Sequence, residues 1–380
     1  MRLVLTRRLA HAATCAGNAG AYAIVNTSPL LLPALQRGLG LDEAEAGGLM
    51  TTALLAMGVM ALGLSPLLVG RRKKYVALAA AFVLAMGFGF AAVAESRTLM
   101  LLSMVAIGLG AGALLAGVNA IIAATEAPDR LFGYALMSAY AVAAALALVL
   151  APAIASAGHR GGFGVLAVFA VGLWPLLLAL PASEGNAPAG PVAGARNSSG
   201  GGIALLVGIG VIGVPMMGFF TFVGGLGESQ QMDPSRIAQI FAAQQVASVV
   251  GAWLAARYCL RLGLRRGILA ATLVHSAVIA LAVWGPGEWP FAVGVVGEGL
   301  SFLFLLPPLL TLAAQLDPSG RWAAAANGAL FLATGLAPAV AGSLVVAFGY
   351  DAIGWLMLVA TPVGLMAFGR SLRAVPCGLR

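Results

Sequence analysis

Twelve apolar stretches, each long enough to cross a lipid bilayer as a helix, make up most of this 380-residue chain. A membrane-spanning helix needs about 20 apolar residues. Only 9% of the residues are charged, whereas a water-soluble domain has about 25%. The alternation of apolar and polar residues that marks a membrane barrel is absent. We therefore predict an all-α integral membrane protein with spans at residues 11–36, 43–69, 74–94, 98–124, 131–157, 162–182, 203–226, 235–257, 267–285, 289–314, 322–347 and 350–370.

The charges between these stretches orient them in the membrane. If the N-terminus is cytoplasmic, all but four of the 21 Lys and Arg residues fall on the cytoplasmic side, the four being Arg37, Arg97, Arg160 and Arg236. Cytoplasmic loops of membrane proteins carry the excess of basic residues, so we expect both termini in the cytoplasm and the chain in a bacterial inner membrane. The net charge of +8 then faces anionic lipid headgroups, and we expect no nucleic-acid partner.

The two halves of the chain repeat each other. A basic segment at residues 70–74 follows the second span, and another at residues 261–266 follows the eighth. Asp42 and Asp233 each stand before a span as a helix N-cap. Small residues around Pro152 recur around Pro338, and such residues permit close helix contact and a helix bend. We predict two pseudo-symmetric six-helix bundles, residues 1–182 and 203–380, joined by a flexible cytoplasmic linker at residues 183–202.

Over its whole length the chain resembles the major facilitator superfamily. The resemblance rests on the two groups of six spans, on the proline-bearing pattern of the fifth and eleventh spans, and on a basic loop between the second and third spans that contains Gly63, Gly70, Arg71 and Arg72. It implies a secondary transporter that works by alternating access, with that loop as part of the gate. It also implies that spans 1, 4, 7 and 10 line a central cavity, and that spans 3, 6, 9 and 12 lie outside.

Two positions depart from the pattern of that family. Leu67 stands where the family's loop motif usually has an aspartate, and Met104 stands where its fourth span usually has an arginine. In drug antiporters of the family, that arginine is associated with proton coupling. The resemblance therefore predicts the fold but leaves open which ion, if any, drives transport.

Glu298 is the only acidic residue that we place inside a span and away from its ends. An ionised carboxylate there costs about 2.5–3.5 kcal/mol on insertion scales, so it should face a cavity and bind a proton or a cationic group. Gly294, Gly297 and Gly299 are expected to leave room around it. The alternative is a neutral glutamic acid that helps the helices to pack. His275, on the peripheral ninth span, is interpreted mainly as a structural residue.

Polar residues inside other spans are further candidates for binding substrate or protons. Asn18, Tyr22 and Asn26 recur every four residues in the first span, which puts them on one helical face; substrate binding and packing are equally open for them. The apolar side chains from Met216 to Phe222 could suit a greasy ligand, but packing or lipid contact is the preferred interpretation. Packing is also preferred for the remaining candidates, Asn119, Gln244, Gln245 and Asn327.

The remaining chemistry narrows the function. No residues have the spacing of a metal site and no phosphate-binding loop is present, so we expect no metal and no cofactor. Every Lys and Arg falls at a span end or in a loop, which disfavours an anionic substrate. We predict a monomeric, non-enzymatic secondary transporter that exports a small neutral, amphipathic or cationic molecule in exchange for protons. Uptake of a nutrient or metabolite by symport or uniport is the alternative. An integral-membrane enzyme is a remote one, because it would need several converging catalytic side chains.

Overall fold

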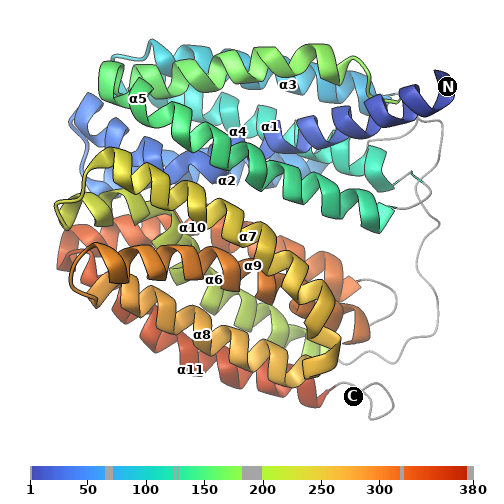
Figure 1. Cartoon of the computed structure of the whole chain (residues 1–380), viewed down its shortest axis with the longest axis vertical. Coiled ribbons are helices and arrows are strands. Elements are labelled where there is room, and N and C mark those ends of the chain that lie inside the picture. The colour runs from blue at the N-terminus through green and yellow to red at the C-terminus, as the bar shows by residue number, and fades with distance from the viewer. Residues whose placement is uncertain are drawn as a thin grey trace. The chain divides into compact units, whose positions relative to one another are not determined.

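The computed structural model describes residues 2–64, 72–123, 125, 128–181, 199–316 and 321–374, and all regular structure in these residues is helical (Figure 1). Most connections between the helices are short. The shortest is Gly263 alone, whose φ of 78° favours glycine. In chain order the helices are α1 (Arg2–Leu39), α2 (Glu43–Leu64), α3 (Arg72–Ala92), α4 (Arg97–Ala123), α5 (Pro128–Leu177), α6 (Ser199–Ser229), α7 (Pro234–Leu262), α8 (Leu264–Trp284), α9 (Glu288–Leu316), α10 (Arg321–Phe348) and α11 (Asp351–Arg373).

The long helix α5 is two helices in succession. Its backbone leaves the helical region at Ala157 (φ −138°, ψ 16°) and at Gly158 (φ 58°, ψ −143°), and the positive φ suits glycine. The break lies where the sequence predicts the connection between the fifth and sixth spans. When the arms 128–156 and 159–177 are counted separately, the described residues contain twelve helices, as predicted.

Ten of these helices are long and apolar enough to cross a membrane, with α5 counted once and only the described residues considered. The helix α1, which contains the first predicted span, is not among them. Its middle carries the buried polar side chains of Thr14, Asn18, Asn26, Thr27 and Ser28. A helix with these polar side chains is better suited to packing against other helices than to contact with lipid. Some of the hydroxyl groups donate to the backbone of α1 itself, as Thr27 Oγ1 does to Ala23 O at 2.7 Å. The chain as a whole is a multi-pass membrane protein.

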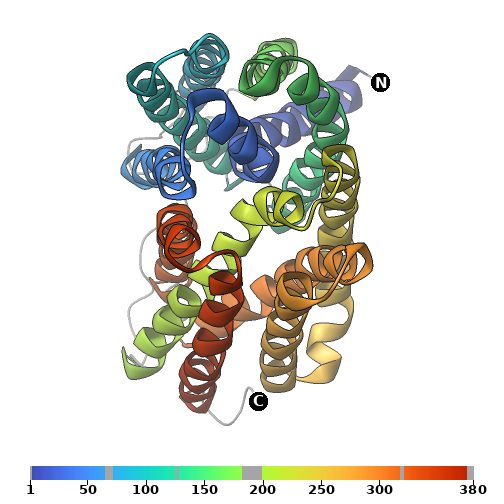
Figure 2. The ribbon, with the colours of Figure 1, turned by 90° about the vertical axis from the view of Figure 1, so that its left-hand side faces the viewer.

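The chain divides into two compact units, Met1–Ala189 and Gly190–Arg380. Figures 1 and 2 show each unit as a bundle of helices packed side by side. In the first unit α2 and α3 pack on α4, and α1 packs on α5; in the second α7 and α8 pack on α9, and α10 and α11 pack on α6. The two units thus repeat one packing scheme. The predicted linker falls largely on residues 182–198, outside the described residues, and α6 already begins at Ser199.

Both predicted N-caps are confirmed. The carboxylate of Asp42 accepts a hydrogen bond from Glu45 N at 2.7 Å, and the Glu45 side chain accepts one back from Asp42 N at 3.2 Å. This reciprocal pair is a capping box. At the equivalent place in the second unit, Asp233 accepts from Ser235 N at 2.7 Å. Hydrogen bonds from Ser235, first from its side chain and then from its backbone N–H, hold the pKa of the Asp233 carboxyl below its usual value.

Two ion pairs repeat between the units with their charges exchanged. In the first unit Arg97, at the start of α4, pairs with Glu45 in the first turn of α2. In the second unit Glu288, at the start of α9, pairs with Arg236 in the first turn of α7 (2.5 Å). Both pairs join residues that are 52 positions apart. Each pair therefore holds equivalent helix ends together, whichever of the two helices carries the arginine and whichever carries the glutamate.

The second of these pairs can be tested by charge reversal. We expect Arg236→Glu to lower the melting temperature of the detergent-solubilised protein, because it sets two carboxylates side by side. Combining Arg236→Glu with Glu288→Arg should restore it. Since exposed pairs contribute about 0.2–1 kcal/mol, the shift will be small. The matched control is Arg160→Glu, whose more exposed pair with Glu95 should matter less. A double variant no more stable than Arg236→Glu would show that the pair does not hold α7 to α9.

Candidate functional site

Glu298 lies in the middle of α9, the helix that packs between α7 and α8 in the second unit. Its side chain is only 1% exposed, and it is the one buried acidic side chain among the described residues. The sequence analysis expected this side chain to face a cavity, whereas in the structure the neighbouring helices enclose it. An acid enclosed in this way must be neutral, paired or hydrogen-bonded, because an isolated buried charge is very unfavourable.

Two side-chain amides of α7 form a chain of hydrogen bonds that ends at this carboxyl group. Gln244 Nε2 donates to Glu298 Oε2 at 2.6 Å, and Gln245 Nε2 donates to Gln244 Oε1 at 2.9 Å. The structure thus brings together three of the predicted site residues. Within the described part of the chain, Glu298 Oε1 and Gln245 Oε1 have no hydrogen-bond partner. A carboxylate can accept about four hydrogen bonds, so a single donor suits a group that also carries a proton.

Four glycines set how closely the neighbouring helices approach α9. On the α7 side, a Cβ at Gly251 would overlap Leu300 O, and one at Gly299 would lie 2.5 Å from Gln244 O. On the α8 side, a Cβ at Gly294 would lie 2.5 Å from a carbonyl oxygen, and one at Gly297 would lie 2.8 Å from the side chain of Val278. The expectation that the glycines around Glu298 leave room beside it is therefore wrong. They bring the helices into contact, which is why Glu298 is enclosed.

A second buried polar pair lies on the α8 side of α9. His275 is fully buried, and its Nδ1 is 2.8 Å from Ser301 Oγ. Ser301 Oγ in turn donates to Gly297 O at 2.7 Å, so the imidazole donates to it. His275 Nε2 has no partner among the described residues. Ser301 is not among the residues predicted from the sequence, although its position about one helical turn after Glu298 is a signal that could have found it.

The first unit holds four of the predicted candidates. Asn18 is buried in α1 and its side-chain amide donates to Ala135 O on α5 at 2.9 Å, which is a packing contact. Asn26 is also buried, and its Nδ2 has no partner among the described residues. Tyr22 on α1 and Asn119 on α4 are half-buried. None of the four contributes to the cluster around Glu298.

The other predicted positions are spread over both units. Asn327, on α10, is exposed, and it does not join the cluster around Glu298. Of the gating loop, Gly63 lies in α2, Gly70 and Arg71 lie outside the described residues, and Arg72 is the first residue of α3. Pro152 and Pro338 lie inside α5 and α10, and the bends that they predict remain predictions.

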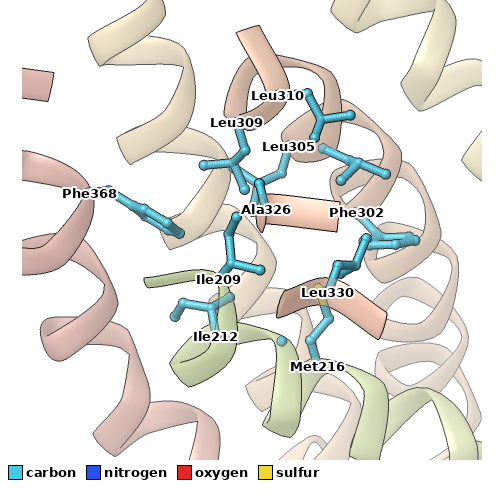
Figure 3. A pocket seen from close by; sticks show the side chains of 12 residues that line it. Ile209, Ile212, Met216, Phe302, Leu305, Leu309, Leu310, Ala326, Leu330 and Phe368 are labelled. Carbon is cyan, nitrogen blue, oxygen red and sulfur yellow. The ribbon is translucent and has the colours of Figure 1, made fainter. Parts of the chain in front are cut away.

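An apolar cavity lies within the second unit, between α6, α9, α10 and α11 (Figure 3). Phe302 contributes to its wall, one turn along α9 from Glu298, and Met216 contributes from α6. The volume is about 20 Å³, close to that of a single water, and the apolar lining offers such a water no partner. The Met and Phe side chains from Met216 to Phe222 are buried, so the packing interpretation of this segment is confirmed. The remaining lining residues are Ile209, Ile212, Gly213, Leu305, Leu306, Leu309, Leu310, Ala326, Leu330 and Phe368.

Comparison with known proteins shows which family model and which solved structures this chain resembles. The family model of the Major Facilitator Superfamily matches residues 14–199, and no curated protein matches the chain. Among solved structures, the chain is similar to a bacterial homologue of the human lysosomal transporter Spinster (TM-score 0.73, 14% identity, 98% of each chain). It is also similar to the peptide transporter POT in complex with sulfate (TM-score 0.74, 16% identity, 96% of this chain and 94% of the other) and to a D-xylose–proton symporter (TM-score 0.74, 14% identity, 98% of each chain).

At these identities the likeness shows the fold, which extends over both units, whereas the family match covers the first unit. The repeated packing scheme and the repeated caps and ion pairs agree with it. Residues 14–199 therefore carry the match to the Major Facilitator Superfamily, and both units share the fold of the solved transporters named above.

Proposed function

We propose that this transporter couples the movement of a small neutral, amphipathic or cationic molecule to protons, and that Glu298 binds the coupling proton. The observation that carries this proposal is the enclosure of Glu298 on α9, with Gln244 as the one donor to its carboxyl group among the residues that the structure describes. An intramembrane acid is expensive to keep unless it has a function.

The chemistry of the carboxyl group supports this role. When it is protonated, the side chain is neutral and can remain between α7 and α9. When it is ionised, it needs more donors than Gln244 supplies, and water or a cationic substrate can provide them. Loss of the proton therefore favours a conformation in which Glu298 is accessible. A change in protonation can in this way be linked to a change in access, which is what a coupled transporter requires.

The charges in the spans support the proposed class of substrate. The only buried Lys or Arg side chain among those described is Lys73, in the first turn of α3, and the second unit has none. An anion would find no counter-charge beside Glu298. The two unpartnered acceptor oxygens of Glu298 and Gln245 suit a molecule that donates hydrogen bonds. The small-residue pattern around Pro152 and Pro338 favours export.

We further propose that both termini face the cytoplasm of a bacterial inner membrane. The distribution of basic residues supports this orientation. It places the ion pairs of Glu45 with Arg97 and of Arg236 with Glu288 at the outer surface. It also places the basic segments at residues 70–74 and 261–266 against the cytoplasmic leaflet.

Transport measurements in proteoliposomes test the proposed coupling. The purified chain is reconstituted, a pH gradient of either sign is imposed, and a panel of lipophilic ammonium cations, sugars and neutral amino acids is assayed against protein-free vesicles. We expect at least one cationic or amphipathic compound to accumulate on the more acidic side, which is the polarity of proton exchange. Accumulation on the more alkaline side would establish symport and uptake instead. Equilibration without accumulation for every transported compound would refute proton coupling.

A further inference from the structure

Gln244 and Gln245 are consecutive residues of α7, yet their side-chain amides meet. Side chains at neighbouring helix positions ordinarily point in different directions and do not interact. Here both residues are buried, with exposed fractions of 2% and 0%, and Gln245 Nε2 lies 2.9 Å from Gln244 Oε1. Gln245 therefore extends toward its neighbour rather than into the bilayer.

This contact decides which end of the Gln244 amide faces Glu298. A glutamine amide has a donor end and an acceptor end, and the network around it determines which way it is oriented. Because Gln245 donates to Gln244 Oε1, Gln244 presents Nε2 to the carboxyl group, and the 2.6 Å contact is a donated hydrogen bond. In the opposite orientation two oxygens would meet, which is favourable only when Glu298 carries its proton on that side.

Gly299 lets α9 pack closely against the Gln244 side chain. A Cβ at position 299 would lie 2.9 Å from Gln244 Cγ and 2.6 Å from Ser248 Oγ. The backbone of α7 is held at the same place, because Ser248 Oγ donates to Gln244 O at 3.0 Å. The orientation of the Gln244 amide is the remaining freedom, and the hydrogen bond from Gln245 favours the orientation that presents Nε2 to Glu298.

We propose that Gln245 is a positioning residue that fixes Gln244 as a hydrogen-bond donor to Glu298 and thereby sets the pH at which the coupling proton is released. The inference rests on the proposed function of Glu298. A donated hydrogen bond stabilises the carboxylate over the acid. Without Gln245, Gln244 is free to turn and accept a hydrogen bond from the protonated acid, so release requires a higher pH.

The other titratable groups near α9 lie away from this contact or are already engaged. On α8, His275 is buried and its Nδ1 is engaged with Ser301, less than one helical turn after Glu298. On α7, Arg236 pairs with Glu288 at the helix ends. The remaining charged or titratable side chains that the structure describes on α6, α7, α8 and α10 are exposed or lie at helix ends, namely Glu228, Arg257, Tyr258, Arg265 and Arg266.

Infrared difference spectroscopy of the reconstituted protein measures proton release without a substrate. The carbonyl stretch of protonated Glu298 is identified as the band missing from Glu298→Gln, and it is titrated with pH in the parent and the variants. We expect Gln245→Met, which keeps the length of the side chain but removes its amide, to move the midpoint by about one pH unit toward alkaline, a tenfold change in proton affinity. Gln245→Leu is the second variant if Gln245→Met does not fold.

The role of Gln244 as intermediary gives the sharper test. Gln244→Met should also move the midpoint, and adding Gln245→Met to it should produce no further shift, because Gln245 acts only through Gln244. Thr272→Val, which removes another fully buried side-chain donor on α8, is the control that should leave the midpoint unchanged. An unmoved midpoint in Gln245→Met, or additive shifts in the double variant, would overturn the positioning role alone. The absence of any titrating band that Glu298→Gln removes would overturn the proposed function itself.

Discussion

Glu298→Gln is expected to abolish accumulation driven by a pH gradient while substrate exchange across the membrane continues. Glutamine has nearly the same shape and keeps the polar contact with α7, but it cannot take up or release a proton. A one-unit pH gradient coupled to one proton per substrate permits accumulation of up to about tenfold. Without coupling, the internal and external concentrations become equal.

The measurement compares two modes of transport in the same proteoliposomes. Gradient-driven accumulation reports coupling, and exchange of labelled for unlabelled substrate without a gradient reports only the reorientation of the loaded protein. Asp351→Asn is the matched control, since Asp351 is an exposed acid in the first turn of α11 and its neutralisation should leave both modes intact. Undiminished gradient-driven accumulation in Glu298→Gln would exclude Glu298 as the proton-binding group. Loss of both modes would show a general defect rather than uncoupling.

Gly251→Ala is expected to destabilise the second unit strongly. A methyl group at this position would overlap Leu300 O on α9, and a backbone oxygen cannot rotate away as a side chain can. The helices α7 and α9 must separate to admit it. Overpacking of this kind costs about 1–3 kcal/mol or more, and the separation should also weaken the hydrogen bond between Gln244 and Glu298.

Thermal unfolding in detergent, followed by tryptophan fluorescence, measures this effect. Gly210→Ala on α6 is the matched control, because a Cβ there meets nothing within 4 Å. Alanine is favoured over glycine within a helix by about 1 kcal/mol, so the control should be neutral or slightly stabilising. Equal melting temperatures for the two variants would show that the approach of α7 to α9 is looser than the structure describes.

Much of the architecture could be predicted because its signals are local. The length and apolar character of each stretch predict a helix, since the backbone must satisfy its own hydrogen bonds in lipid. The caps at Asp42 and Asp233 depend on residues within one turn. The position of Glu298 within a helix followed from the apolar residues on both sides of it.

The surroundings of Glu298 could not be predicted in the same way. The glycines near it suggested open space, but they pack closely against atoms of α7 and α8. His275 lies on a helix expected at the periphery, yet it is fully buried against α9. From the sequence, packing was the preferred interpretation of Gln244 and Gln245. Only the packing of α7 against α9 shows that the Gln244 amide is hydrogen-bonded to Glu298 and that Gln245 is bonded to Gln244. Each of these outcomes depends on a helix far away in the chain.

The sequence by itself therefore determined that this chain forms membrane-spanning helices in two repeated halves, with one acid among their apolar residues. The tertiary structure decided which side chains meet that acid and from which direction. The physical reason is that helix formation in lipid depends on composition over about 20 residues. The pairing of helices depends on a few small residues that let particular backbones approach, and the position of Gly251 against Leu300 can be recognised only once both helices are in place.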